Sequence, residues 1–433
     1  MALDPHALAR ECLRAGIDAA HPERVVADAV SLDGDQLTVA GTEYDLSNVD
    51  DLLVVGGGNA AGTVAAALES VLDDRLDRGL VVTDVPVRTD RVELVEGSHP
   101  VPDAAAVQGV ERLRELLADA GERTLVLAVV TGGGSALLPA PEAGISLVDL
   151  RETTDRLLAS GAAIDEMNAV RKHLSAAKGG RLATATAPAR TVVLAFSDVV
   201  GDDLAVVASG PFAPDESTFA EARSVLDRHD VSVPAAVAER LARGVRGEIP
   251  ETPAPGAPAF DRVTAHVLAN GYTAAGAAVD RAADAGVESV LLSTRVRGEA
   301  REAAKTHVAV AEETVATGNP IEPPAVIVSG GETTVTRRGE SGTGGPNHEF
   351  ALSAALELDV GGVVVGAVDT DGVDGNATTA GAVVDIDTVS DPRDARRALA
   401  AHDAAGYLAD RGATVDTGPT GTNVNDLRVV VVA

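Results

Sequence analysis

Short apolar runs alternate along the chain with longer amphipathic stretches. In the first half, the apolar runs cover 51–55, 80–83, 125–130 and 191–196, and the amphipathic stretches cover 60–72, 104–120 and 147–160. Short aliphatic runs predict buried strands, whereas longer stretches with charged residues on one face predict helices. Their regular alternation is typical of βαβ units, and it predicts a mostly parallel sheet covered by helices.

A proline-rich segment divides this alternation into two parts. Four prolines lie between Glu248 and Ala259, and such a segment makes a poor helix or strand and a good boundary. The length of 433 residues also exceeds that of one ordinary core. We therefore predict an N-terminal domain over 1–248 and a C-terminal domain over 259–433. The second domain is expected to contain strands over 263–268, 290–293, 325–328, 363–368 and 427–432 and helices over 274–285 and 299–317.

The chain is strongly acidic. It has 66 acidic and 35 basic residues, a formal net charge of -31, and only three lysines, namely Lys172, Lys178 and Lys305. This charge disfavours binding to nucleic acid and to anionic membranes. An acidic surface with few lysines and small aliphatic core residues indicates adaptation to high salt, which screens the self-repulsion, and we expect a halophilic protein.

Cysteine use and hydropathy favour a cytoplasmic protein. Cys12 is the only cysteine, which excludes an intrachain disulfide and a thiolate metal cluster. No stretch reaches the roughly 18 apolar residues of a membrane helix, and residues 1–20 do not have the pattern of a signal peptide. The oligomeric state stays open, with a homodimer as one alternative.

Three glycine-rich segments each follow a predicted strand. They are 56–62 (GGGNAAG), 131–135 (TGGGS) and 329–334 (SGGETT). Glycines at the carboxyl end of a strand allow backbone N–H groups to converge on an anion. Three such loops favour phosphate binding over simple turns. The first also fits a dinucleotide fingerprint, with Asp84 after the next strand, so an NAD(P)-dependent reductase is an alternative.

Positive charge is concentrated in residues 171–181. This segment contains Arg171, Lys172, Lys178 and Arg181, and therefore two of the three lysines of the chain. A transferred phosphoryl group needs such charge neutralisation. If the segment is helical, Lys178 and Arg181 lie on one face. The alternative is a solvated basic surface paired with acids.

Carboxylates follow two of the predicted strands. Asp198 and Asp202 follow the strand over 191–196, and Asp369 and Asp371 follow the strand over 363–368. Clustered carboxylates can hold Mg²⁺ or take a proton from a hydroxyl group, although Asp and Gly are also common in ordinary turns. Two polar segments are further candidates for a site, 344–350 before a predicted helix and 418–426 before the last strand.

Seven strings in a fixed order resemble the glycerate 2-kinase family with a C-terminal MOFRL domain. They are 97–103 (GSHPVPD), 132–135 (GGGS), 168–175 (NAVRKHLS) with 178–181 (KGGR), 197–202 (SDVVGD), 209–211 (SGP), 329–334 (SGGETT) and 417–426 (TGPTGTNVND). The resemblance implies a Rossmann-like, mostly parallel sheet in a large N-terminal domain, a smaller C-terminal α/β domain, and an active site in the cleft between them. It also implies ATP, Mg²⁺ and the conversion of D-glycerate to 2-phospho-D-glycerate. Members have often been labelled hydroxypyruvate reductases, which keeps the reductase alternative.

The residue patterns and the resemblance together assign candidate roles. The catalytic candidates are Lys172, Lys178, Asp198 and Asp371, and the metal candidates are Asp198, Asp202 and Asp369. The candidates for binding substrate or nucleotide are Gly57, Gly58, Asn59, Gly132, Gly133, Gly134, Ser135, Arg171, Arg181, Gly331, Glu332, Thr333, Asn347, Glu349, Asn423, Asn425 and Asp426.

Two positions depart from the pattern of the family. Asn59 stands where members usually have a lysine, and Pro346 stands where many have an arginine. Both are charges expected near substrate or phosphate. Either Arg171 or Lys172 supplies the missing charge, or the substrate is another small hydroxy acid. A non-catalytic protein that binds sugar acids is a further alternative.

Overall fold

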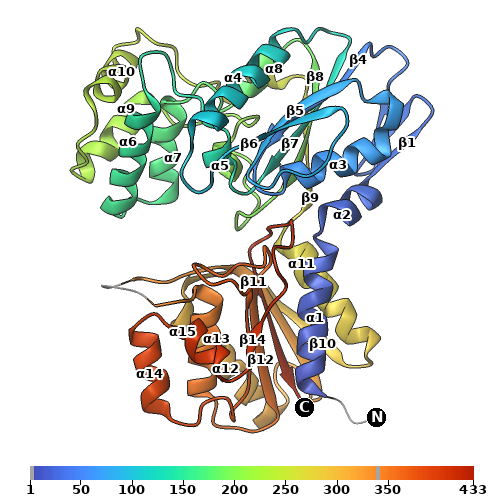
Figure 1. Cartoon of the computed structure of the whole chain (residues 1–433), viewed down its shortest axis with the longest axis vertical. Helices are drawn as coiled ribbons and strands as arrows, with labels where there is room; N and C mark the ends of the chain where they lie inside the picture. The colour runs from blue at the N-terminus through green and yellow to red at the C-terminus, as the bar shows by residue number, and fades with distance from the viewer. Residues whose placement is uncertain (1–3, 338–341) are drawn as a thin grey trace. The chain divides into compact units, whose positions relative to one another are not determined.

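The computed structural model describes residues 4–337 and 342–433, and these form two compact units (Figure 1). The N-terminal unit consists of Val25–Ser197 and Asp202–Leu268. The C-terminal unit consists of the chain up to Arg24, Asp198–Gly201 and Ala269–Ala433. None of the described helices is long and apolar enough to cross a membrane.

The units differ from the predicted limits of 1–248 and 259–433 because the residues up to Arg24 belong to the C-terminal unit and the proline-rich segment is bound to the N-terminal unit. Thr252 Oγ1 donates to Asp215 Oδ2 at 2.8 Å, and the Asp215 N–H donates to Pro253 O at 2.9 Å. The boundary falls instead near the end of β9 (Val263–Ala269), which lies beside β8 at the edge of the N-terminal sheet.

The N-terminal unit is built on a six-stranded sheet with the order β6-β5-β4-β7-β8-β9. Five of its strands pair in parallel: β4 (Asp51–Gly57), β5 (Arg78–Thr83), β6 (Val92–Glu96), β7 (Thr124–Thr131) and β8 (Arg190–Phe196). This confirms the predicted Rossmann-like sheet. The order runs outward from β4 and β7 in opposite directions, so the first two glycine-rich loops lie at the switch point where such sheets bind ligands.

Helices of the N-terminal unit cover the sheet and form a second core. α3 (Ala61–Leu72) and α4 (Ala104–Ala118) pack on β5, while α6 (Leu147–Ser160), α7 (Ile164–His173), α9 (Phe219–Arg228) and α10 (Ala235–Val245) enclose Leu157, Val170 and Phe219. The shorter elements are α2 (Pro22–Ala29), α5 (Gly134–Leu137), α8 (Arg181–Thr186) and an antiparallel sheet of β1 (Val30–Asp33), β2 (Gln36–Val39) and β3 (Thr42–Asp45).

The basic segment 171–181 is not one helix. α7 ends at His173 and α8 begins at Arg181. Between them, Gly179 and Gly180 have φ angles of 55° and 76°, a left-handed conformation that ends a helix. The condition under which Lys178 and Arg181 would share a helical face is therefore not met.

The C-terminal unit contains a mixed sheet with the order β10-β11-β15-β12-β13-β14. β10 (Glu288–Glu299) and β11 (Ala325–Thr334) are parallel, whereas β15 (Asp426–Val432), β12 (Val363–Asp369), β13 (Gly381–Val384) and β14 (Thr414–Val415) each pair antiparallel with their neighbours. α1 (Pro5–Ala19) and α11 (Gly271–Asp284) cover one face of the sheet, and α12 (Ala300–Thr317) and α13 (Pro346–Glu357) cover the other (Figure 1). A Cβ on Gly16 would lie 2.4 Å from Leu427 Cδ2, so α1 packs directly on β15.

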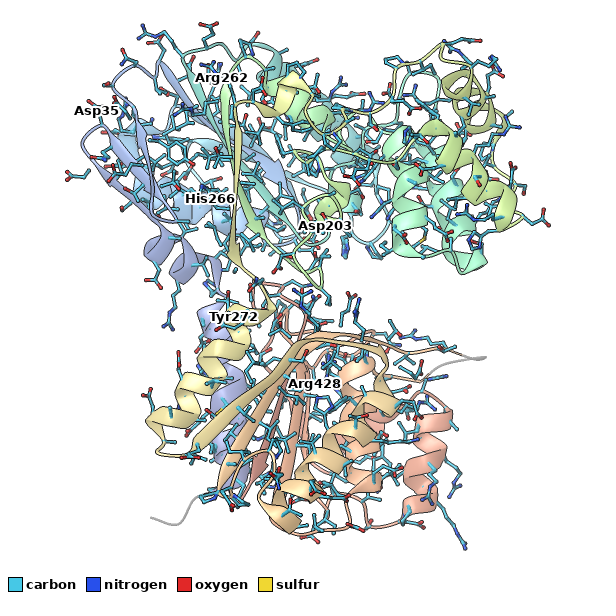
Figure 2. All side chains as sticks on the ribbon, turned by 180° about the vertical axis from the view of Figure 1, so that it is seen from behind. Asp35, Asp203, Arg262, His266, Tyr272 and Arg428 are labelled. Atoms are coloured by element: carbon cyan, nitrogen blue, oxygen red, sulfur yellow. The ribbon has the colours of Figure 1, made fainter. Side chains whose placement is uncertain are left out.

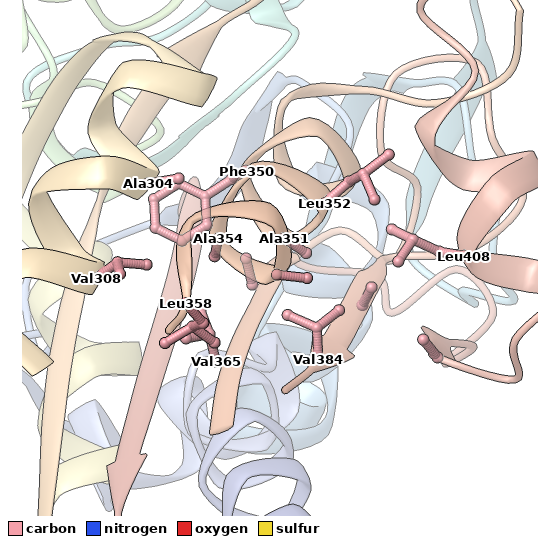
Figure 3. Packing of buried hydrophobic residues seen from close by; sticks show 14 of the residues in the cluster. Ala304, Val308, Phe350, Ala351, Leu352, Ala354, Leu358, Val365, Val384 and Leu408 are labelled. Carbon is pink, nitrogen blue, oxygen red and sulfur yellow. The ribbon is translucent and has the colours of Figure 1, made fainter. Parts of the chain in front are cut away.

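α13 is buried on nearly all sides, and every residue from Asn347 to Ala355 is buried. Its apolar side chains, such as Phe350 and Leu352, pack in a core of small aliphatic residues from α12, β12, β13, α14 (Pro392–Ala400) and α15 (Ala404–Ala409), which includes Val308, Val365, Val384 and Leu408 (Figure 3). Because this helix has little exposed surface, the polar residues at its start need partners inside the protein.

Candidate active site

The first two glycine-rich loops lie against each other at the carboxyl ends of β4 and β7. The Asn59 N–H donates to Gly132 O at 2.8 Å, and a Cβ on Gly58 would lie 2.1 Å from Thr131 Oγ1. The Asn59 side chain lies over Gly133, where a Cβ would come within 1.7 Å of Asn59 Oδ1. Gly58 and Gly133 are therefore required by the close approach of the two loops.

The backbone N–H groups of the two loops differ in their availability. In the first loop, those of Gly58, Asn59 and Ala61 donate to carbonyl groups of the protein, whereas those of Ala60, Gly62 and Thr63 have no acceptor among the described residues. In the second loop, the N–H groups of Gly134 and Ser135 at the start of α5 likewise have no acceptor among the described residues. Both loops therefore offer backbone N–H groups to an anion.

Lys178 connects the basic segment to this second loop. Its Nζ donates to Ser135 O at 2.8 Å and to Leu138 O at 3.2 Å. Burial, with a smaller effect of the nearby Arg171 guanidinium, lowers the pKa of Lys178 to about 7, and burial also lowers the pKa of Arg171. In the part of the chain that the structure describes, neither cation forms an ion pair with a carboxylate.

Lys172 and Arg181 have their charges paired inside the protein. Lys172 Nζ lies 3.1 Å from Asp215 Oδ1, and both side chains are buried. Arg181 Nη1 lies 3.6 Å from Glu142 Oε1, an oxygen that also pairs with Arg240. The structure thus brings Lys178 to the second loop, with Arg171 near Lys178, and gives Lys172 and Arg181 other partners.

In the C-terminal unit, Asp426 is the centre of a buried polar network. Asn347 Nδ2 donates to Asp426 Oδ1 at 2.6 Å, and the Thr333 N–H donates to Asp426 Oδ2 at 2.9 Å. Arg428 also donates to Asp426. This arginine is fully buried within the sheet, and its guanidinium lies 4.9 Å from the centroid of the Phe350 ring (Figure 2). The network joins the third glycine-rich segment to α13 and β15.

Two further contacts fix the start of α13. The Asp374 carboxylate accepts from the N–H groups of Asn347 at 3.0 Å and His348 at 2.8 Å. Glu349 is buried and pairs with Arg301 and His402, each at 2.7 Å. Both carboxylate oxygens of Glu349 are therefore occupied, which favours a structural role over contact with substrate.

Carboxylates at the ends of β11, β12 and β15 carry more negative charge than their neighbours compensate. Burial and the nearby Asp371 and Asp426 raise the pKa of Asp369 well above its usual value, and burial raises the pKa of Asp371. Glu332 retains exposed surface, yet desolvation together with Asp198 and Asp426 raises its pKa to about 7. Such a site stabilises a bound cation.

No complete metal site is preformed in residues 4–337 and 342–433. They contain no group of three His, Cys, Asp or Glu side chains placed to hold one ion. Mg²⁺ at a nucleotide site usually takes one or two protein carboxylates and completes its shell with phosphate oxygens and water. The donor set near Asp369 therefore fits Mg²⁺ that arrives with a nucleotide.

Comparisons with known proteins identify the family of this chain. A family model described as a domain of unknown function (DUF4147) matches residues 8–242, and the MOFRL family matches residues 325–426. The chain is 38% identical to the glycerate 2-kinase of Pyrococcus horikoshii, with 100% of this chain and 98% of the relative aligned. The chain belongs to the glycerate 2-kinase family. The resemblance predicted from the sequence is therefore confirmed.

Two other known proteins are similar to this chain over most of its length. The crystal structure of glycerate kinase from Thermotoga maritima superposes with a TM-score of 0.85 at 34% identity, and the match covers 99% of each chain. A putative hydroxypyruvate reductase from Agrobacterium vitis is 41% identical over 88% of this chain and 87% of its own length. The fold of this family is thus confirmed for the whole chain.

The remaining candidate site residues are divided between the two units. Asp198 belongs to the C-terminal unit and Asp202 to the N-terminal unit. Asn423 Nδ2 donates to Asp371 Oδ2 at 3.4 Å, and Asn425 O accepts from Thr370 Oγ1 at 2.8 Å. Gly57 ends β4, and Gly331 has a φ of 135° within β11, where a Cβ would lie 2.2 Å from Val296 O.

Sequence reasoning missed three residues of the C-terminal network. Arg428 is a single charge in the otherwise aliphatic strand 427–432, and this isolation was a usable indication. Asp374 lies in the acidic run after β12, but nothing in its spacing distinguishes it from a turn residue. Arg301 has no local pattern, because its partner Glu349 is 48 residues away.

Proposed function

We propose that this chain is an ATP-dependent kinase that phosphorylates D-glycerate at its 2-hydroxyl group to give 2-phospho-D-glycerate. Its relatives in Pyrococcus horikoshii and Thermotoga maritima are glycerate kinases. The observation that carries the proposal is the position of Lys178 beside the second glycine-rich loop, with Arg171 near Lys178. The buried Lys178 and the half-buried Arg171 have no carboxylate partner among the described residues, and in a chain of net charge -31 they favour an anionic ligand at this loop.

The phosphoryl group would be stabilised by groups of the N-terminal unit. The Lys178 ammonium and the N–H groups of Gly134 and Ser135 would bind its oxygens, and a bound phosphate would favour the protonated form of Lys178. In the reaction, the 2-hydroxyl oxygen of glycerate forms a bond to phosphorus as the bond between phosphorus and the ADP oxygen breaks. The hydroxyl proton must pass to a nearby base.

Carboxylates of both units are the candidates for that base and for Mg²⁺. Asp371 and Asp198 are the proposed proton acceptors, and Asp369, Asp198 and Asp202 are the proposed metal ligands. The raised pKa of Asp369 and Asp371 supports a site that gains from a cation or a proton. When bound with the nucleotide, Mg²⁺ supplies neutralisation of the charge on the phosphate oxygens.

The positions of Asn59 and Pro346 require that other residues supply positive charge. Arg171 and Lys172 were the possible sources of this charge expected from the sequence, but Lys172 already forms an ion pair with Asp215. We propose that Arg171, together with Lys178, supplies this charge. The contact of Lys178 with Ser135 O and the electrostatic effect of Arg171 on Lys178 support this role.

A hydroxypyruvate reductase is the second candidate, because a relative at 41% identity has that name. It would use the first glycine-rich loop for the pyrophosphate of NAD(P). However, the N–H groups of Gly58, Asn59 and Ala61 already donate to Val82 O, Gly132 O and Gly58 O. These three N–H groups are not available to a pyrophosphate, although those of Ala60, Gly62 and Thr63 at the start of α3 have no acceptor among the described residues. The kinase is favoured instead by the relatives of the chain that are glycerate kinases over nearly its whole length.

An ADP-release assay with ATP and Mg²⁺ in molar KCl separates the candidates. Glycerate, glycerol and hydroxypyruvate are supplied in turn, and NADH and NADPH oxidation is followed in parallel. We expect ADP with glycerate alone, and ³¹P NMR of the product should show the phosphate on the 2-oxygen. Oxidation of NADH by hydroxypyruvate, without ADP formation from ATP and glycerate, would refute the kinase.

The charge of the chain supports a salt-rich cytoplasm as its location. The net charge is -31, and the single thiol, Cys12, is buried and free. Burial raises the pKa of Cys12 to about 11, which keeps it in the unreactive thiol form. We propose that the protein is halophilic and cytoplasmic.

A further inference from the structure

The N-terminal unit contains a cavity of about 600 Å³. Its walls come from α7, from the segments 203–206 and 212–217, and from β9 with the residues before it. Phe212, Phe260 and Val263 are among the apolar residues that line the cavity. A volume of 300–1,000 Å³ is typical of pockets that enclose a small-molecule ligand, and a three-carbon acid would fill only a small part of this one.

The charge of the cavity disfavours an anion. Lys172 and Asp215 line it but compensate each other at 3.1 Å. Asp165, Asp203 and Glu216 also line it, with no further cation among the lining residues (Asp203 is labelled in Figure 2). The carboxylate of glycerate and the phosphates of a nucleotide would be repelled there. Ionised carboxylates only accept hydrogen bonds, so they favour a neutral group that has several donors.

The cavity shares a wall residue with the site proposed for phosphate. Asn168 lines the cavity, and its Oδ1 accepts from Ser209 Oγ at 3.2 Å. Ser209 Oγ lies 2.7 Å from Ser135 Oγ in the second glycine-rich loop. Two hydrogen bonds thus lead from the cavity wall to the loop, and one ligand that is apolar and donor-rich at one end and anionic at the other matches both places.

We propose that this cavity binds the nucleoside part of the phosphate donor. The base would pack on Phe212, Phe260 and Val263, and its amino group and the sugar hydroxyls would donate to the acidic side chains. The inference rests on the proposed function, since it takes ATP as the donor. It adds to that function a separate nucleoside site within the N-terminal unit.

The variant Ala265→Trp tests the site. Ala265 lines the cavity on β9 and is exposed, so an indole there narrows the cavity without entering the core. Ala238→Trp is the matched control, because Ala238 is also exposed but lies on α10 and does not line the cavity. Equilibrium dialysis in molar KCl measures the binding of ATP and of inorganic tripolyphosphate, and steady-state kinetics give KM for ATP and for glycerate.

We expect Ala265→Trp to weaken ATP binding and to raise KM for ATP on the order of tenfold or more, while tripolyphosphate binding and KM for glycerate stay within about twofold. Ala238→Trp should leave all four quantities unchanged. In the unaltered protein, adenosine should compete with ATP, which tests the site without any substitution.

Three results would overturn the inference: unchanged ATP binding in Ala265→Trp, equal weakening of ATP and tripolyphosphate, or an effect on glycerate alone. If ADP still forms from ATP and glycerate in those cases, the proposed function stands without this site. If adenosine competes and Ala265→Trp weakens ATP, but glycerate never yields ADP, the nucleoside site stands and the proposed function fails.

Discussion

Replacing Lys178 by methionine removes a buried ammonium and retains most of the aliphatic side chain, so it separates charge from packing. Lys178 is 2% exposed, and burial is the main cause that lowers its pKa from 10.5 to about 7. At about 1.36 kcal/mol per pH unit, this difference means that keeping Lys178 charged costs the folded chain roughly 5 kcal/mol relative to the unfolded chain.

The sign of the pH dependence follows from the lowered pKa. Above pH 10.5, Lys178 is neutral in both the folded and the unfolded chain, and the cost is absent. As the pH falls from 10.5 towards 7, the unfolded chain binds a proton that the folded chain does not, so the folded protein loses stability. Below pH 7 the full cost applies, and Lys178→Met removes it.

The loss of two hydrogen bonds opposes this gain in stability. The variant leaves Ser135 O and Leu138 O without their donor, at about 1 kcal/mol each. We therefore expect Lys178→Met to be more stable than the unaltered protein by roughly 3 kcal/mol near pH 6 and less stable by roughly 2 kcal/mol near pH 11. The loss of the ammonium should lower kcat/KM by on the order of 100-fold, or about 3 kcal/mol.

Urea unfolding in molar KCl at several pH values measures the first effect, and ADP release measures the second. Lys305→Met is the control, because Lys305 is exposed and pairs with Glu302 at 2.8 Å. Such a surface pair contributes only about 0–1 kcal/mol, so this variant should change neither quantity appreciably. A stability difference for Lys178→Met that does not vary with pH, or kinetics close to those of the unaltered protein, would refute the reasoning.

Three other expectations concern stability. Lys172→Ala should destabilise the N-terminal unit by about 3–5 kcal/mol in urea unfolding, because Asp215 stays buried without its cation. A second change of Asp215 to Ala should restore part of this loss of stability. A Lys172→Ala variant as stable as the unaltered protein would contradict the importance of the buried pair. Arg428→Met should cost a similar amount, about 3–5 kcal/mol, because Asp426 loses its arginine partner. An unchanged urea midpoint would show that the network does not need this charge. Removal of KCl should lower Tm, because the repulsion within a chain of net charge -31 is then unscreened. Full activity and an unchanged Tm in dilute buffer would exclude the salt requirement.

The helices and strands that were predicted best from the sequence are those with a clear pattern of burial. All eight residues of β7 are buried, and the apolar run 125–130 was recognised as a strand for that reason. The helix over 147–160 was predicted with the observed bounds of α6. The small sheet of β1, β2 and β3 was missed, since its strands have only four residues each and are half-exposed, which leaves a weak alternation.

The candidate site was predictable where it depends on local chemistry and not where it depends on distant partners. The loops 56–62 and 131–135 could be found because glycine is needed at the close approach itself. The separation of Lys172 from Lys178 could not be found, because the partner of Lys172 is Asp215, 43 residues further along. Composition marks a lysine as unusual, but only the tertiary structure shows whether its charge is already paired.

The packing of α1 on β15 makes the order of synthesis important for folding. β15 lies in the centre of its sheet, between β11 and β12, and it leaves the ribosome after all the other strands described here. The N-terminal unit, which ends at Leu268, can fold while later residues are still being made. The helix α1, translated first, can pack on α11 and β12 earlier, but its packing on the sheet is complete only when the strand around Leu427 emerges. A nascent chain of this protein therefore exposes two open strand edges and part of the apolar face of α1 during elongation, and it is at that stage that we expect the chain to depend most on chaperones.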